Sequence, residues 1–177
     1  MTSLDVLPLA VSEAWSLLSK DAVPTIEFGR WQAQARTFFD ATIESSAVPN
    51  IVTAAASGVL SFELVFAWVC DPTMQTGVSI RSLPLEFAPS VVLAANEAVE
   101  AIGGAGMDVL VARATRLWQV AERPSYGSEM RAPLVVAAIL ASVLLAPIVP
   151  PDGRSIFGVK GARMRLDKLD GSKCVSC

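Results

Sequence analysis

Apolar positions recur along most of the chain at spacings of three, four and seven residues, the period of an α-helix. The segments that carry this pattern are 10–20, 25–45, 51–69, 90–103, 107–121 and 128–146. Segment 51–69 is apolar almost all round, which is typical of a helix buried on most sides. Together these segments predict an all-α protein, an antiparallel four-helix-type bundle with additional short helices.

Two further stretches depart from the helical pattern. Residues 71–89 hold three prolines and a glycine, which predicts a loop with one short strand at Val78-Ser-Ile-Arg81. After Pro150-Pro151 the chain turns basic, with six of its fourteen cations in residues 152–177. We therefore expect a helical bundle domain over 1–151 and a basic, flexible C-terminal tail over 152–177.

The composition is strongly apolar for 177 residues: 53% hydrophobic and only 18% charged. Such a chain is expected to bury surface against neighbouring copies or to place some of it in lipid. The uncharged run 132–149 approaches the length of a membrane span. Pro133 and Pro147 shorten the usable helix, which favours a core helix or a subunit interface over the membrane alternative.

The sequence offers little for catalysis. Histidine is absent, which removes the usual general base and metal ligand, and no known catalytic or phosphate-binding motif occurs. No enzyme activity, cofactor or metal site is therefore expected. The terminal Cys174-Val-Ser-Cys177 has the shape of a prenylation signal, so Cys174 is a candidate lipidation site. The alternative is an incidental tail, because a terminal cysteine is atypical of that signal.

The arginines are the main candidates for binding. Arg113 and Arg116 lie three apart on the expected helix 107–121, so both are predicted to project from one face and reach a single run of phosphates. Arg36 is expected opposite the apolar stripe of helix 25–45, and Arg81 in the loop. The alternative is a set of solvated or salt-bridged surface arginines. The net charge of −3 argues against a generally basic nucleic-acid binder.

The stretch from Trp31 to Thr37, sixteen residues after Trp15, resembles the Phe-Gln-Thr-Gln-Gln-Ala-Arg-Thr segment of tobamovirus coat proteins. Val78–Arg81 and Arg113–Arg116 resemble two further segments of that family in the same order, the second of which contacts RNA there. The family's Arg-Arg-Val-Asp-Asp motif has no clear counterpart. The resemblance implies a compact helical subunit of a rod-shaped RNA virus.

These observations lead to one leading hypothesis and one alternative. The first is a non-enzymatic coat subunit of the virion, found also in the host cytoplasm, that self-assembles in many copies around single-stranded RNA. Its phosphate contacts would come from Arg36, Arg81, Arg113 and Arg116. A membrane partner is not expected. The alternative is a cytosolic helical interaction protein, lipid-anchored through Cys174 and the basic tail.

Overall fold

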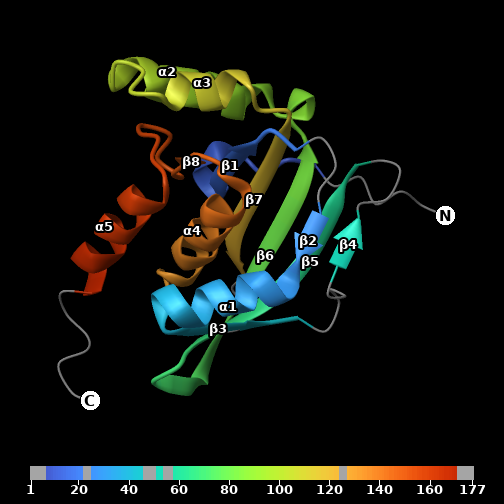
Figure 1. Cartoon of the computed structure of the whole chain (residues 1–177), viewed down its shortest axis with the longest axis vertical. Helices are drawn as coiled ribbons and strands as arrows, with labels where there is room; N and C mark the ends of the chain where they lie inside the picture. The colour runs from blue at the N-terminus through green and yellow to red at the C-terminus, as the bar shows by residue number, and fades with distance from the viewer. Residues whose placement is uncertain (1–6, 22–24, 46–50, 54–57, 124–126, 171–177) are drawn as a thin grey trace.

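A computed structural model describes residues 7–21, 25–45, 51–53, 58–123 and 127–170 (Figure 1). Its helices are two short 3-10 turns, η1 (Val11–Glu13) and η2 (Leu85–Phe87), and α1 (Phe28–Phe39), α2 (Pro89–Ala101), α3 (Met107–Ala112), α4 (Ala132–Leu144) and α5 (Val159–Asp170). Its strands are β1 (Trp15–Ser19), β2 (Thr25–Glu27), β3 (Ala41–Glu44), β4 (Ile51–Thr53), β5 (Leu60–Trp68), β6 (Asp71–Pro84), β7 (Arg116–Arg123) and β8 (Ile148–Val149).

The centre of the molecule is a six-stranded sheet in the order β3-β5-β6-β7-β1-β8. Every neighbouring pair in it is antiparallel, and β2 and β4 form a separate antiparallel pair. The prediction of an all-α, four-helix-type bundle is therefore wrong. The chain folds as a mixed α/β protein whose helices cover an antiparallel sheet.

Both faces of the sheet are covered, and the side chains alternate between them. Leu17 and Trp118 belong to one buried cluster, together with residues of α1, α4 and α5. Their chain neighbours Leu18 and Leu117 belong to a second cluster with residues of α2 and α3. Successive side chains of a strand point to opposite faces. Hence α1, α4 and α5 pack on one face and α2 and α3 on the other, as Figure 1 shows.

Segment 51–69 was expected as a buried helix, and the structure contradicts this. Residues 51–53 form β4, and residues 60–68 form β5. Along β5 the side chains of Phe62, Leu64 and Phe66 are buried, whereas Ser61 and Glu63 between them are exposed. This period of two, with aromatic and β-branched residues, is the pattern of a strand.

The predictions of two other helices are also wrong. Residues 10–20 contain η1 and β1, and the expected helix 107–121 breaks after Ala112 and continues as β7. The expected loop 71–89 is mostly β6, which contains the short strand predicted at Val78–Arg81. The helices expected in 90–103 and 128–146 are confirmed, with slightly different bounds, as α2 and α4. The helix expected in 25–45 is confirmed only in its middle, as α1, because its two ends form β2 and β3.

Helix α4 forms the middle of the larger core. Its residues Ala132–Ala141 are all buried, and it contacts α1, α5, β1 and β7. The prediction of a core helix within 132–149 is therefore confirmed. In the part of the chain that the structure describes, no helix combines the length and the apolar character needed to cross a bilayer.

The C-terminal region is packed, which corrects the prediction of a flexible tail over 152–177. Phe157, Ala162 and Leu166 belong to the same buried cluster as α4, and Ile148 exchanges two backbone hydrogen bonds with Phe157. Gly161 allows this packing, because a Cβ there would lie 2.7 Å from the Cβ of Phe157. Residues 152–170 thus share the core of the rest of the chain, and Cys174 lies outside the described residues.

Candidate functional site

Arg113 and Arg116 do not project from one helix face, because the helix ends between them. Arg113 is the exposed C-cap of α3, and Arg116 is the first residue of β7, with only 2% of its surface exposed. The Arg116 guanidinium donates to the Gly58 carbonyl at 2.6 Å and to the Ser82 hydroxyl at 3.2 Å. Its burial lowers the pKa of Arg116. Arg116 therefore ties β6 and β7 to the backbone at Gly58.

Arg81 and Arg36 lie on different sides of the sheet. Arg81 follows Ile80, which faces α1 and α4, so Arg81 points to the opposite face. There its guanidinium donates to the Leu7 carbonyl at 2.9 Å. Arg36 is exposed on α1, beside a small hollow that Glu44 also lines. The structure does not gather the four predicted RNA-binding arginines on one surface, and phosphate binding by each stays a prediction.

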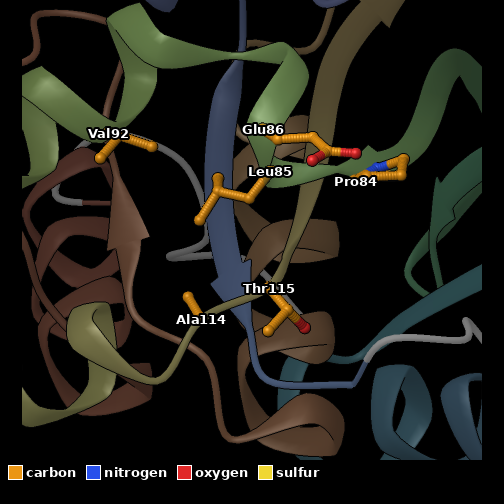
Figure 2. Close-up of a pocket in the computed structure, with 6 residues that line it drawn as sticks. All are labelled: Pro84, Leu85, Glu86, Val92, Ala114 and Thr115. Atoms are coloured by element: carbon orange, nitrogen blue, oxygen red, sulfur yellow. The ribbon is translucent and has the colours of Figure 1, made fainter.

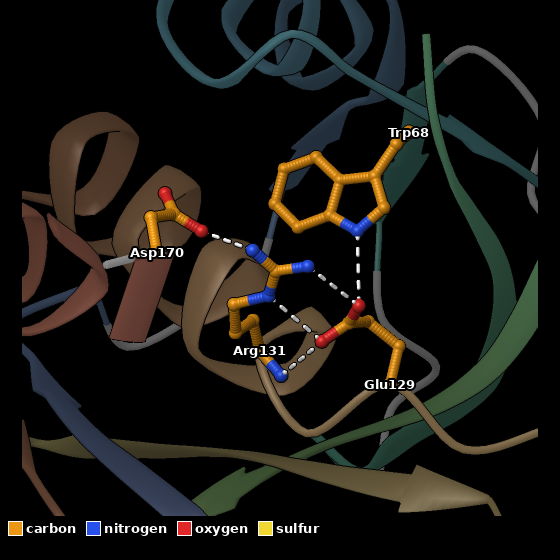
Figure 3. Close-up of polar contacts among 4 residues, drawn as sticks. All are labelled: Trp68, Glu129, Arg131 and Asp170. Atoms are coloured by element: carbon orange, nitrogen blue, oxygen red, sulfur yellow. Dashed lines mark hydrogen bonds and ion pairs between the residues drawn. The ribbon is translucent and has the colours of Figure 1, made fainter. Parts of the chain in front are cut away.

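A polar network that the sequence did not reveal joins β5, the start of α4 and the end of α5 (Figure 3). The Arg131 guanidinium donates to both carboxylate oxygens of Glu129 at 2.9 Å and also contacts Asp170. The Trp68 indole N–H donates to Glu129 at 3.1 Å, and Arg131 stacks over the same indole at 4.7 Å. The sequence signal for this network is the pair Glu129-x-Arg131 just before a helix. That pair does not indicate which residues of β5 or α5 complete the network.

The electrostatics of this network indicate a structural role. The hydrogen bond from Arg131 lowers the pKa of Glu129 to about 2, against desolvation, which raises it. The same bond raises the pKa of Arg131. A carboxylate with so low a pKa is a poor proton acceptor near neutral pH. The network therefore acts as an electrostatic clamp between three elements.

An open groove of about 580 Å³ runs beside α5. Its apolar side chains come from β1, α4, α5 and the segment just before α5, and the two charged side chains among its described lining residues are both cations of α5. The principal lining residues are Trp15, Leu134, Phe157, Met164, Arg165 and Lys168. Arg165 is held in place, since its guanidinium donates to the Ser155 hydroxyl at 2.7 Å and lies 4.2 Å from the Phe157 ring. Lys168 and Met164 are exposed and available to a partner.

The layer of η2, α2 and α3 exposes large apolar side chains on the far side of the molecule from α1. Along α2, Val91 and Ala95 face the core, whereas Leu93 on the outer stripe is 60% exposed. We call this outer surface the α2–α3 layer and define it by its exposed large apolar residues, which are Phe87, Leu93, Ile102, Val109 and Leu110.

A second hollow, of about 500 Å³, lies at the edge of this layer (Figure 2). Figure 2 shows Pro84, Leu85 and Glu86 at the end of β6 and in η2, with Ala114 and Thr115 across from them and Val92 on α2 to the side. Of the described residues that line it, only Glu86 and Thr115 have polar side chains. A single carboxylate and a single hydroxyl do not form a recognisable catalytic arrangement, so we regard the hollow as part of the surface relief of the α2–α3 layer.

Among the residues that the structure describes, no three His, Cys, Asp or Glu side chains come together as a metal site. Comparison with protein-family models, curated proteins and solved structures finds no significant match to this chain. The resemblance to tobamovirus coat proteins consequently has no further support, and the helical-bundle fold that it implied is contradicted by the sheet.

Proposed function

We propose that this protein is a structural subunit that assembles with copies of itself through the α2–α3 layer. One observation carries the proposal: five large apolar side chains are exposed on this single layer. Several large apolar side chains exposed on one layer favour an interaction site, because soluble proteins usually bury such surface. The low proportion of charged residues, 18%, supports the same conclusion. The proposal keeps the self-assembly expected from the sequence and leaves out RNA, because the four arginines share no surface.

The experiment is sedimentation velocity of the purified chain over a range of concentrations. We expect the wild-type chain to form species larger than a monomer as its concentration rises. The double substitution Leu93→Ser with Val109→Ser, which we call the layer variant, should remain monomeric, because it removes exposed apolar area from both helices of the layer. Both residues are exposed, so its circular dichroism spectrum should match that of the wild type.

The matched control removes exposed apolar area elsewhere. Met74 in β6 and Met130 before α4 are 63% and 73% exposed and lie outside the α2–α3 layer. The variant Met74→Ser with Met130→Ser should associate as the wild type does. A wild-type chain that stays monomeric at every concentration tested would refute the proposed function, and so would a control variant that dissociates as fully as the layer variant.

A further inference from the structure

The α2–α3 layer and the groove beside α5 have opposite charge, although each exposes apolar side chains. From Leu85 to Ala112 the chain contains acids and no lysine or arginine; the acids are Glu86, Glu97, Glu100 and Asp108, all exposed. On α2, Glu97 and Glu100 share the outer stripe with Leu93. The layer therefore exposes large apolar side chains together with carboxylates.

The groove beside α5 is the complementary surface. Among the described residues, its lining contains two cations, Arg165 and Lys168, and no carboxylate, in a chain whose net charge is −3. Its outer side chains Met164 and Leu169 are 54% and 46% exposed. Trp15 and Leu134 bring apolar surface to the same lining. The groove thus offers an apolar recess with a basic rim to a partner that is apolar and acidic.

We infer that the α2–α3 layer of one copy docks into the α5 groove of the next. This inference rests on the proposed self-assembly and specifies its interface. A helix that lays an apolar face into a groove is a common recognition mode, in which side chains one turn apart serve as anchors. Here Leu93 and Val109 supply the apolar contact with Met164, and the carboxylates of α2 face Lys168. Apolar burial provides the free energy, and the charges select the orientation.

The two surfaces belong to different elements and lie apart in the molecule, α2 and α3 at one end and α5 along another side (Figure 1). An interface that joins two different surfaces is heterologous. Each bound copy leaves one layer and one groove unoccupied, so such contacts build a ring when the rotation closes and a filament when it does not. The assembly is therefore head-to-tail and not a symmetric dimer.

Mixing two variants that each retain a single surface tests this arrangement. The layer variant keeps its groove, and a groove variant, Met164→Ser with Lys168→Gln, keeps its layer. Each alone should be monomeric, with association weakened by about tenfold or more. Mixed in equal amounts, they should form a heterodimer and nothing larger, because the second interface is disabled on both sides. Sedimentation velocity and light scattering measure these masses.

A charge test with a matched control accompanies the mixing experiment. Lys168→Glu places a like charge opposite the carboxylates of α2 and should weaken wild-type association. Lys160→Glu changes the same charge on the same helix at an exposed position outside the groove lining, and should weaken it much less. Equal effects of the two substitutions would overturn the assignment of the groove.

The remaining outcomes separate the interface from the proposed function. A wild-type monomer overturns the proposed function itself. A wild type that assembles while the groove variant assembles equally well overturns only the head-to-tail interface. A groove variant that forms homodimers would indicate that two α2–α3 layers pair symmetrically, and it also overturns the inference. Two monomeric variants that do not bind each other on mixing contradict it as well.

Discussion

At the scale of single residues, Arg116 is a buried tether that joins β7 to Ser82 in β6 and to Gly58. Its guanidinium occupies the space beside Gly58, where φ is +66° and a Cβ would approach Nη2 to 3.1 Å. We expect Arg116→Ala to lower the free energy of unfolding by about 3 kcal/mol, because it leaves the Gly58 carbonyl and the Ser82 hydroxyl without their donor.

Arg113→Ala is the matched control for this prediction. Its side chain is exposed, so the free energy of unfolding should change by less than about 0.5 kcal/mol. Urea denaturation of both variants provides the measurement. Similar losses from both substitutions would contradict the tether described for Arg116, and would instead support two arginines in equivalent surroundings.

The Glu129 carboxylate makes the stability of the protein depend on pH in the acidic range. Its pKa is lowered from 4.5 to about 2 in the folded chain, so the folded state binds the proton less tightly than the unfolded state. Ionised Glu129 therefore stabilises the fold above about pH 4.5. This contribution, on the order of 2–3 kcal/mol, is lost as the pH falls from about 4.5 towards about 2.

Glu129→Gln tests the linkage, because the amide cannot ionise. The free energy of unfolding of the wild type and the variant can be measured by denaturation at a series of acidic pH values. Plotted against pH, the two curves should converge as the pH approaches about 2. The wild type should be the more stable at neutral pH. Parallel curves, with a constant difference in the free energy of unfolding, would show that the charge of Glu129 does not contribute to stability through Arg131.

At the scale of secondary-structure elements, α5 is part of the core although its sequence is basic. Leu166 is 6% exposed and packs in the cluster of α4, whereas Leu169 one turn later is 46% exposed. We expect Leu166→Ala to lower the free energy of unfolding by about 2–5 kcal/mol through the cavity it leaves. Leu169→Ala should cost less than about 1 kcal/mol.

Thermal unfolding followed by circular dichroism compares the two leucine variants. The charged residues of α5 obscured this helix in the sequence, because they made residues 152–170 resemble a solvated tail. Only the two buried positions Ala162 and Leu166, spaced four residues apart, signal the packed face. Equal midpoints for both variants would restore the tail interpretation for this region.

At the scale of the whole molecule, the assembly is expected to depend on temperature in the manner of apolar burial. Removing apolar surface from water is driven by entropy near room temperature, so association should strengthen on warming. Sedimentation at about 5 °C and about 25 °C should therefore show a larger mean mass at the higher temperature. The layer variant, measured in parallel, should show no such change. A wild type whose mass falls on warming would contradict an interface formed by the α2–α3 layer.

The features that can be predicted from the sequence alone are those that depend on neighbours a few residues away. The helical period and the terminating Gly103-Gly104 located α2, and an uncharged run between two prolines identified α4 as a core helix. The same local pattern identified most of α1. In each case the apolar pattern that identifies the helix lies within a window of a dozen residues, so no distant partner is needed to recognise it.

Segments whose hydrogen-bond partners are far away in the chain depend on tertiary contacts for their secondary structure. Residues 60–68 contain apolar positions that suit both a helix and a strand, and pairing with β3 and β6 selects the strand. The chain from Met107 to Arg123 likewise becomes a short helix and a strand because β7 fits between β6 and β1. That break turns Arg113 towards solvent and buries Arg116. The shared helix face predicted for Arg113 and Arg116 therefore does not form. The spacing of nearby residues could not reveal this, because it does not encode the register between distant strands.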